Sequence, residues 1–497
     1  MKKGSDSLNT SIREGSCELD LMNLQQKCLI LAAIEPSNEI KINFWKSILF
    51  RIYQIIIVST YIPLLVIQIF GCYHYRYDFL TLLDGIVPIG LASIGFFVPL
   101  SANWKIATEL VRKFERDSVF IKAINQNNTK NINLLNEAQR FTKFLTCTLL
   151  VCITLSAGIW FTQPHIFAVL ESFTNKKENS NSTIIMDPLK MYPLVIWIPY
   201  VDITATIPYM FISTLIGTCI FIVSTRGATF ISYSVSIMIY TTTQFKMVAT
   251  CMNEIDNVDD NELEFTDNNI ISNNNGLSKQ VLNCPNNKSP DELKRTHEEH
   301  LDDVKKQIKR KKFNVYKNIK LQDFEYEKCL LCPEEDEVKA ITQLINSVKD
   351  HQQILKIINE VNDAFSSMFF MTIMLGALSL SLALFVVAVN PDFSNKLKNA
   401  SAVMVLLIYG WIIFSNGEDV KEEGIKIHHT AYNLQWFKHS TKFKKILQII
   451  IMRSQKPCGI MLGPLMDMTI ENYSNILNTA YSYFTLLVQF ESKDSEK

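Results

Sequence analysis

Long apolar stretches alternate with polar segments along the whole chain. Six of them approach or exceed the ~20 residues that an α-helix needs to cross about 30 Å of hydrocarbon. They are Ser47–Gly71, Phe79–Asn103, Phe141–Gln163, Tyr192–Ser224, Ala364–Asn390 and Ala400–Ser415. The pattern therefore predicts an all-α membrane protein, and a weaker apolar stretch at about Met466–Phe490 predicts a seventh spanning helix.

The seventh stretch carries hydroxyl or amide side chains at nearly every turn. Hydrocarbon offers these groups no hydrogen-bond partner, so we expect this helix to face water or other helices inside the membrane. Four residues share one face at helical spacing: Ser482, Leu486, Gln489 and Phe490. Several copies of this face around an axis would form a pore, with Leu486 as a hydrophobic constriction and Gln489 as a polar ring.

A polar seam between packed helices is the alternative interpretation of the same stretch. Small residues let helices approach closely in a membrane, and Ser474, Ser482 and Thr485 would serve in that way. Helical spacing alone leaves both interpretations open.

Basic residues are distributed unevenly among the connecting segments, and this predicts the orientation of the chain. Six Lys or Arg precede Ser47, seven lie in Trp104–Arg140 and eight in Asn416–Asp467, whereas the alternate loops hold few. Two of those few are Lys396 and Lys398. Because positively charged loops stay in the cytoplasm, the N-terminus should be cytoplasmic and, after seven spans, the C-terminus extracellular.

The region 253–350 differs from the rest, because it is rich in Asn, Asp, Glu and Lys and should be largely disordered. Helical spacing resumes near Glu337. The expected organisation is a cytoplasmic arm (1–46), spans one to four with a ligand pocket (47–252), a long cytoplasmic insert (253–350), spans five and six with a cytoplasmic anchor region (351–464), and the last helix with a short extracellular tail (465–497).

The third and fourth spans contain candidate ligand-binding residues. Cys152, Ser156 and Trp160 share a face of the third span. With Tyr200, Pro208 and Tyr209 of the fourth, they would line an apolar pocket with a few polar groups, which suits a small lipophilic ligand. Ordinary packing of the helix bundle is the alternative.

Two carboxylates, Asp84 and Asp202, lie within spans near their expected outer ends. A charge there is not expected to face lipid. These side chains would either line a water-filled vestibule and bind a polar ligand group, or simply contact water at the membrane surface. The second interpretation is the simpler one.

Other chemistry is weakly represented. No nucleophile, dinucleotide or metalloprotease motif is present, so neither an enzyme nor a cofactor is expected. The single pair Cys329 and Cys332 lacks a second pair, so no metal site is expected. The net charge of zero gives no bias toward nucleic acid, but a basic amphipathic stretch at 304–320 could bind anionic lipid or calmodulin. Asn181 begins a glycosylation sequon in a loop expected outside.

Several motifs, spread over most of the chain, closely resemble those of insect odorant receptors. The C-terminal run Thr479-Ala480-Tyr481-Ser482-Tyr483-Phe484-Thr485 is similar to the closing motif of the family. Further similar segments are Pro199-Tyr200-Val201-Asp202, Tyr240-Thr241-Thr242-Thr243-Gln244-Phe245, His351-Gln352-Gln353-Ile354-Leu355 and Arg453-Ser454-Gln455-Lys456-Pro457. Residues 255–335 have no counterpart in typical odorant-tuning members.

The resemblance implies an odorant-tuning subunit of a ligand-gated cation channel in the plasma membrane of olfactory neurons. Such subunits form heterotetramers with a shared co-receptor, and the pore is lined by the last helix. By resemblance, Leu486, Gln489 and Phe490 align with the gate, and the ligand pocket includes Trp160 and Met210. A gustatory-type channel and a metabotropic receptor coupled to a G protein are the alternatives.

Overall fold

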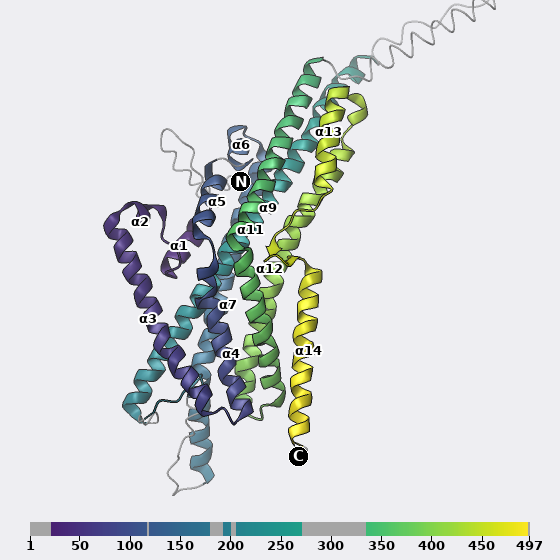
Figure 1. Cartoon of the computed structure of the whole chain (residues 1–497). Helices are drawn as coiled ribbons and strands as arrows, with labels where there is room; N and C mark the ends of the chain where they lie inside the picture. Colours follow the sequence, from purple (N-terminus) through teal and green to yellow (C-terminus); the bar gives the residue numbers. More distant parts are fainter. Residues whose placement is uncertain (1–20, 117–118, 179–191, 200–204, 271–333, 496–497) are drawn as a thin grey trace, which may run out of the picture. The chain divides into compact units, whose positions relative to one another are not determined.

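A computed structural model describes residues 21–116, 119–178, 192–199, 205–270 and 334–495, which are almost entirely helical (Figure 1). The helices are α1 (Asn23–Leu31), α2 (Asn38–Ile42), α3 (Phe44–His74), α4 (Phe79–Phe96), α5 (Trp104–Arg116), α6 (Val119–Asn125), α7 (Thr129–Glu178), α9 (Thr206–Ile270), α11 (Glu334–Val389), α12 (Phe393–Asn433), α13 (Thr441–Ser454) and α14 (Ile470–Ser495), with 3₁₀ turns η1 (Val98–Ser101) and η2 (Trp436–Lys438). One small antiparallel hairpin, β1 (Met461–Leu462) and β2 (Met466–Asp467), precedes α14.

The chain divides into two compact units. The first comprises the chain up to Val248 together with Asp350–Ile425 and the segment from Lys456 onward, and the second comprises Ala249–Lys349 and Lys426–Gln455. The second unit contains η2 and α13, and there Glu337 accepts hydrogen bonds from the imidazole of His439 (2.7 Å) and the backbone N–H of Ser440 (2.9 Å). The candidate site described below lies entirely in the first unit.

Six helical segments of the described chain are long and apolar enough to span a membrane, as the sequence predicts. They are Phe44–His74, Phe79–Ser101, Thr129–Gln163, Ile207–Asp256, Asp336–Val389 and Phe393–Asn433. α14 has 26 residues, which is long enough to span, but it is too polar to be counted with these six. Its status as a seventh span therefore stays a prediction.

The predicted start of the fourth span was wrong. The fourth was expected from Tyr192, but 192–199 is not helical and α9 begins only at Thr206. Pro193 and Pro199 explain the difference, because proline disfavours helical backbone in the residue before it. The third span ends at Gln163, as expected, although the helix α7 itself continues to Glu178. Helical structure does return close to Glu337, since α11 begins at Glu334.

The N-terminal segment from residue 21 packs into the first unit. Gln25 is 1% exposed, and its amide donates to Thr146 on α7 (3.1 Å) and Ser236 on α9 (3.2 Å). The Arg226 guanidinium of α9 donates to the backbone carbonyl of Ala32 (2.5 Å). These buried polar contacts join α1 to two long helices, and each donor needs its partner because no water reaches it.

Helix α4 is central to the first unit because it packs against several partners. Leu83 and Val87 contact buried residues of α11, and the same clusters include Ala480 and Phe484 of α14. Gly95 lets α4 approach α9 closely, since a Cβ there would lie 2.5 Å from the carbonyl oxygen of Val223. The helix thus lies between α9, α11 and α14.

Candidate functional site

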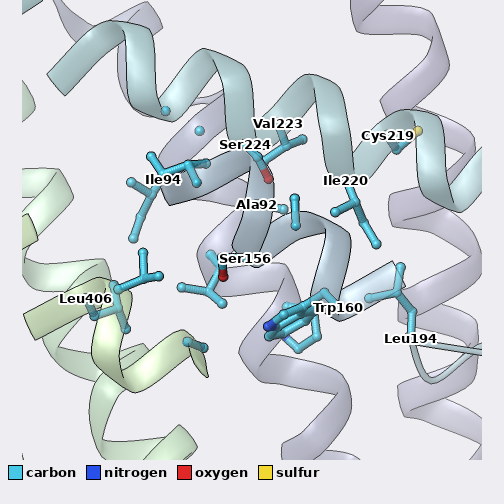
Figure 2. Close-up of a pocket in the computed structure, with 18 of the residues that line it drawn as sticks. Ala92, Ile94, Ser156, Trp160, Leu194, Cys219, Ile220, Val223, Ser224 and Leu406 are labelled. Atoms are coloured by element: carbon cyan, nitrogen blue, oxygen red, sulfur yellow. The ribbon is translucent and has the colours of Figure 1, made fainter. Parts of the chain in front are cut away.

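A cavity of about 170 Å³ lies among α3, α4, α7, α9 and α12 (Figure 2). Most of its wall is aliphatic or aromatic, and none of the described residues that line it is charged. The side chains of Ser156 and Trp160 on α7 face Val223 and Ser224 on α9 across the space (Figure 2). The lining residues are Tyr61, Leu64, Gln68, Pro88, Leu91, Ala92, Ile94, Gly95, Ile153, Ser156, Ala157, Trp160, Leu194, Cys219, Ile220, Val223, Ser224, Gly227, Ile231, Ala402, Val405, Leu406 and Tyr409.

The residues predicted to bind a ligand are only partly brought together. Ser156 and Trp160 line the cavity. Tyr209 does not line it, but packs against the cluster that contains Trp160 and hydrogen-bonds to the imidazole of His165. Met210 is 64% exposed and faces away from the core. Tyr200, like Asp202, Asn181 and the pair Cys329 and Cys332, lies outside the described residues.

Trp160 is held in place by contacts with α12. Its indole N–H donates to the Ser401 hydroxyl (3.0 Å), which itself donates to the backbone carbonyl of Lys398 (2.7 Å). The ammonium of Lys398 lies 5.7 Å from the centre of the Trp160 ring, within the range of a cation–π contact. The indole therefore forms a fixed part of the cavity wall.

Asp84 forms a buried ion pair, which corrects the expectation that this carboxylate contacts water at the membrane surface. One oxygen accepts from the Lys398 ammonium at 2.7 Å and the other from the Asn399 amide at 2.8 Å. The side chains of Asp84 and Lys398 are 8% and 4% exposed. Lys398 was expected in a loop, but α12 begins at Phe393 and carries it into the bundle. Asp84 does not line the cavity.

A second, smaller cavity of about 60 Å³ adjoins the wall of the first. Four residues line both: Ile94, Ile231, Leu406 and Tyr409. On its other side the small cavity is lined by Tyr473, Ile476 and Leu477 of α14. A single layer of shared side chains therefore separates the first cavity from a space that α14 borders.

The predicted pore residues all lie on the open face of α14. Leu486 and Phe490 are 49% and 60% exposed, and Ser482 and Gln489 are also exposed. The opposite face packs into the first unit through Ala480, Leu477, Phe484, Leu487 and Val488. Within this chain the packing seam is therefore aliphatic and aromatic, and the exposed Ser474 and Ser482 take no part in it.

Several hydroxyls of α14 bond to the helix itself. Ser474, Thr479 and Ser482 each donate to the carbonyl four residues earlier, at 2.8 to 3.1 Å. These hydroxyls are thus satisfied without water. The amides of Asn475, Asn478 and Gln489 are the stronger indication that this face meets polar surroundings.

Sequence reasoning missed Tyr61, Tyr409 and Lys398. Tyr61 and Gln68 are polar residues seven apart on an apolar helix, which places both on one face and is a usable signal. Lys398 could have been placed inside the bundle, because the stretch Ala400–Ser415 is too short to span and must extend into its polar flank.

Comparison with known proteins gives consistent similarities. A family model described as 7tm Odorant receptor matches residues 102–481. Odorant receptor 10 of Aedes albopictus is 30% identical over 148 residues, and Odorant receptor Or2 of Anopheles gambiae is 26% identical over 145 residues. These matches cover 30% and 29% of this chain, but only 40% and 38% of the two relatives.

The fold is similar to that of a solved olfactory receptor. The structure of OR5 from Machilis hrabei in complex with eugenol gives a TM-score of 0.62 at 12% identity, covering 95% of this chain and 98% of the other. The helical fold and its apolar spans define a multi-pass membrane protein. Because the family model covers most of the chain, this protein belongs to the 7tm odorant receptor family.

The buried ion pair predicts a sharp stability effect. Lys398→Met leaves the Asp84 carboxylate buried without its cation, which should reduce the free energy of unfolding by about 3–5 kcal/mol. The double variant Asp84→Asn with Lys398→Met removes both charges and should recover most of that loss. Thermal unfolding of the detergent-solubilised protein measures both effects.

Lys396→Met is the matched control, since Lys396 lies two residues earlier on α12 and is only half-buried. It should unfold close to the wild-type temperature. Equal unfolding temperatures for Lys398→Met and Lys396→Met would show that the pair has no structural role.

Proposed function

We propose that this chain is an odorant-binding subunit of a ligand-gated cation channel in the plasma membrane of sensory neurons, where it acts in olfaction. Membership of the odorant receptor family supports the proposal. The observation that carries it is the layer of side chains shared by the apolar cavity and the smaller cavity beside α14. A ligand in the first cavity would press on side chains that also border the last helix.

The cavity suits a small lipophilic molecule. An apolar protein cavity of roughly 150 Å³ is known to bind benzene, so about 170 Å³ accommodates one ring with a short substituent. The uncharged lining disfavours ions, because an unpaired charge would lose its hydration without compensation. Ser156 and Trp160 are the predicted residues that would contact such a ligand directly.

Helix α4 offers a second route from the ligand to α14. Pro88 and Leu91 line the cavity, while Val87 packs in the cluster that includes Ala480. A small displacement of α4 would therefore alter the packing under α14. Tightly packed helices shift between discrete arrangements and do not deform gradually, which suits a gate with open and closed states.

The pore itself requires more than one chain. The face formed by Ser482, Leu486, Gln489 and Phe490 is exposed in the single chain, and several such faces around an axis would enclose a conduit. We propose that the other copies of the last helix come from co-receptor subunits in a heterotetramer. Leu486 would then form the hydrophobic constriction and Gln489 a polar ring.

We also propose that the N-terminus is cytoplasmic and the C-terminus extracellular, because the basic loops alternate in that sense. An epitope tag after Lys497 should be stained by antibody on intact cells, whereas a tag before Met1 should require permeabilisation. The opposite staining pattern would contradict the channel proposal and would instead match the orientation of a G-protein-coupled receptor.

Charge placed on the open face of α14 should change ion permeation. Gln489→Lys introduces a cation into the proposed polar ring, so the permeability to cations relative to anions should fall, because rings of Lys or Arg favour anions in pores. Reversal potentials measured in cells that also express the co-receptor would record the change. Glu491→Gln is the matched control, since it raises the charge by the same one unit on the same helix, at a position about 160° around the helix from Gln489.

The control should leave the reversal potential unchanged. If Gln489→Lys is also without effect while ligand-evoked currents persist, this chain's α14 does not line the pore, and its open face is a packing surface between subunits.

A further inference from the structure

A third pocket, of about 160 Å³, lies between α7, α9 and α12 and shares no residue with the two cavities described above. Its wall differs from theirs because it carries charge. Glu137 of α7, Lys246 of α9 and Asp419 of α12 line it, and all three residues are exposed. Their charged groups are therefore within reach of a molecule that enters the pocket. One cation and two carboxylates thus meet in one pocket of the surface.

The pocket lies where its three helices change between apolar and polar sequence. On α7, Glu137 comes one turn before Phe141, where the apolar stretch begins. On α12, Asp419 comes one turn after Ser415, where another apolar stretch ends, and on α9 Lys246 follows a long run without charged residues. In a membrane protein such changes mark the level at which hydrocarbon gives way to lipid headgroups. The charged pocket therefore lies at the level of the headgroups.

An exposed apolar stripe on α7 leads from this pocket into the hydrocarbon. Phe141 itself lines the pocket, and Phe144, Val151 and Leu155 are exposed further along the helix. At about 100° per residue, these three residues and Glu137 all lie within about 80° of Phe141, so they share one face. The rise from Phe141 to Val151 is about 15 Å, which is the depth of one leaflet. An acyl chain along this stripe would place its headgroup beside Glu137.

We propose that the pocket and the stripe together bind a phospholipid whose headgroup carries a primary ammonium, as in phosphatidylethanolamine. The ammonium contacts the carboxylates of Glu137 and Asp419, and the phosphate contacts Lys246. The volume is adequate, because a cavity of roughly 150 Å³ holds benzene and this headgroup is only slightly larger. The assignment does not rest on the proposed channel function, and requires only that the chain spans a membrane.

The charges of the pocket favour this headgroup over others. A choline headgroup has no N–H, so it cannot donate a hydrogen bond to either carboxylate, whereas a primary ammonium donates up to three. An anionic headgroup without an amine would bring its charge close to two carboxylates and be repelled. Contacts that Lys246 and Asp419 make within the protein do not exhaust them, because an ammonium has three donors and a carboxylate about four acceptor positions.

The test measures lipid binding to the purified full chain in detergent by native mass spectrometry. It uses three lipids with the same dioleoyl chains, namely phosphatidylethanolamine, phosphatidylcholine and phosphatidylglycerol. Phosphatidylethanolamine should bind with a dissociation constant about fivefold lower than that of either other lipid, which is the effect of one charge-assisted hydrogen bond at a partly exposed site.

Glu137→Gln and Asp419→Asn each remove one carboxylate from the pocket and keep the size of the side chain. Each should reduce the preference for phosphatidylethanolamine over phosphatidylcholine several-fold, because only the first lipid loses a hydrogen bond to the carboxylate. Glu422→Gln is the matched control, since Glu422 is exposed on α12 but does not line the pocket. It should retain the wild-type preference.

Lys246→Met tests the contact with the phosphate. Because both zwitterionic lipids carry a phosphate, this variant should weaken the binding of both to a similar degree and leave the preference between them intact. Lys143→Met is its matched control, since Lys143 is exposed on α7 and lies outside the pocket. It should leave the binding of both lipids unchanged.

The assignment is overturned if phosphatidylcholine or phosphatidylglycerol binds as tightly as phosphatidylethanolamine, or if both carboxylate variants keep the wild-type preference. Soluble phosphoethanolamine distinguishes a free headgroup from the whole lipid. It should not displace the lipid at equal concentration, because it lacks the acyl chains that contact α7, and displacement would contradict the role of the stripe. Lipid binding is measured without ion conduction, so its outcome is separate from that of the channel proposal.

Discussion

Asp84 and Lys398 place opposite charges inside an apolar helix bundle, where neither ion could be accommodated alone. The pair fixes α4 against α12 at one position, because moving either helix would separate the two charges. Lys398 also contacts the Trp160 ring, and the adjoining Ser401 holds the indole N–H. The position of the main aromatic wall of the cavity therefore depends on this one buried interaction.

The cavity and the last helix are connected through the same set of helices. Helix α4 lines the cavity on one side and packs in the clusters that support α14 on the other. Tyr409 and Leu406 of α12 border both the larger cavity and the small cavity next to α14. Coupling between ligand and gate would thus need no long pathway, because one layer of side chains separates the two regions.

The sequence predicted the large features of this fold well, since six apolar stretches can be satisfied in a membrane only as helices. Helical spacing also predicted which face of α14 would line a pore, and that face is exposed in the single chain. Hydropathy placed the start of the fourth span too early, because it does not take into account the effect of Pro193 and Pro199 on the backbone. The ion pair joins residues 314 positions apart, and no local pattern reports such a contact.

The sequence predicted only part of the cavity lining, because contacts between residues far apart in the chain leave no local pattern. Ser156 and Trp160 share a helix face and could be found by spacing, whereas Tyr61 and Tyr409 come from other helices and meet them only in the folded bundle. The family resemblance suggested Met210 as well, but its exposure here depends on how α9 is rotated. The spacing of residues within one helix shows which of them share a face, but only the packing of the helices shows which residues that face contacts.

The central claim is that a ligand bound to this chain opens an ion pathway directly. Current through inside-out patches from cells that express this chain and its co-receptor tests it, with a panel of small uncharged odorants that includes acetophenone and with no GTP or ATP in the bath. Patches that contain the co-receptor alone serve as the control. We predict a ligand-evoked cation current that persists without nucleotide and is absent from the control. A current that disappears when nucleotide is withdrawn would contradict the account and indicate signalling through a G protein.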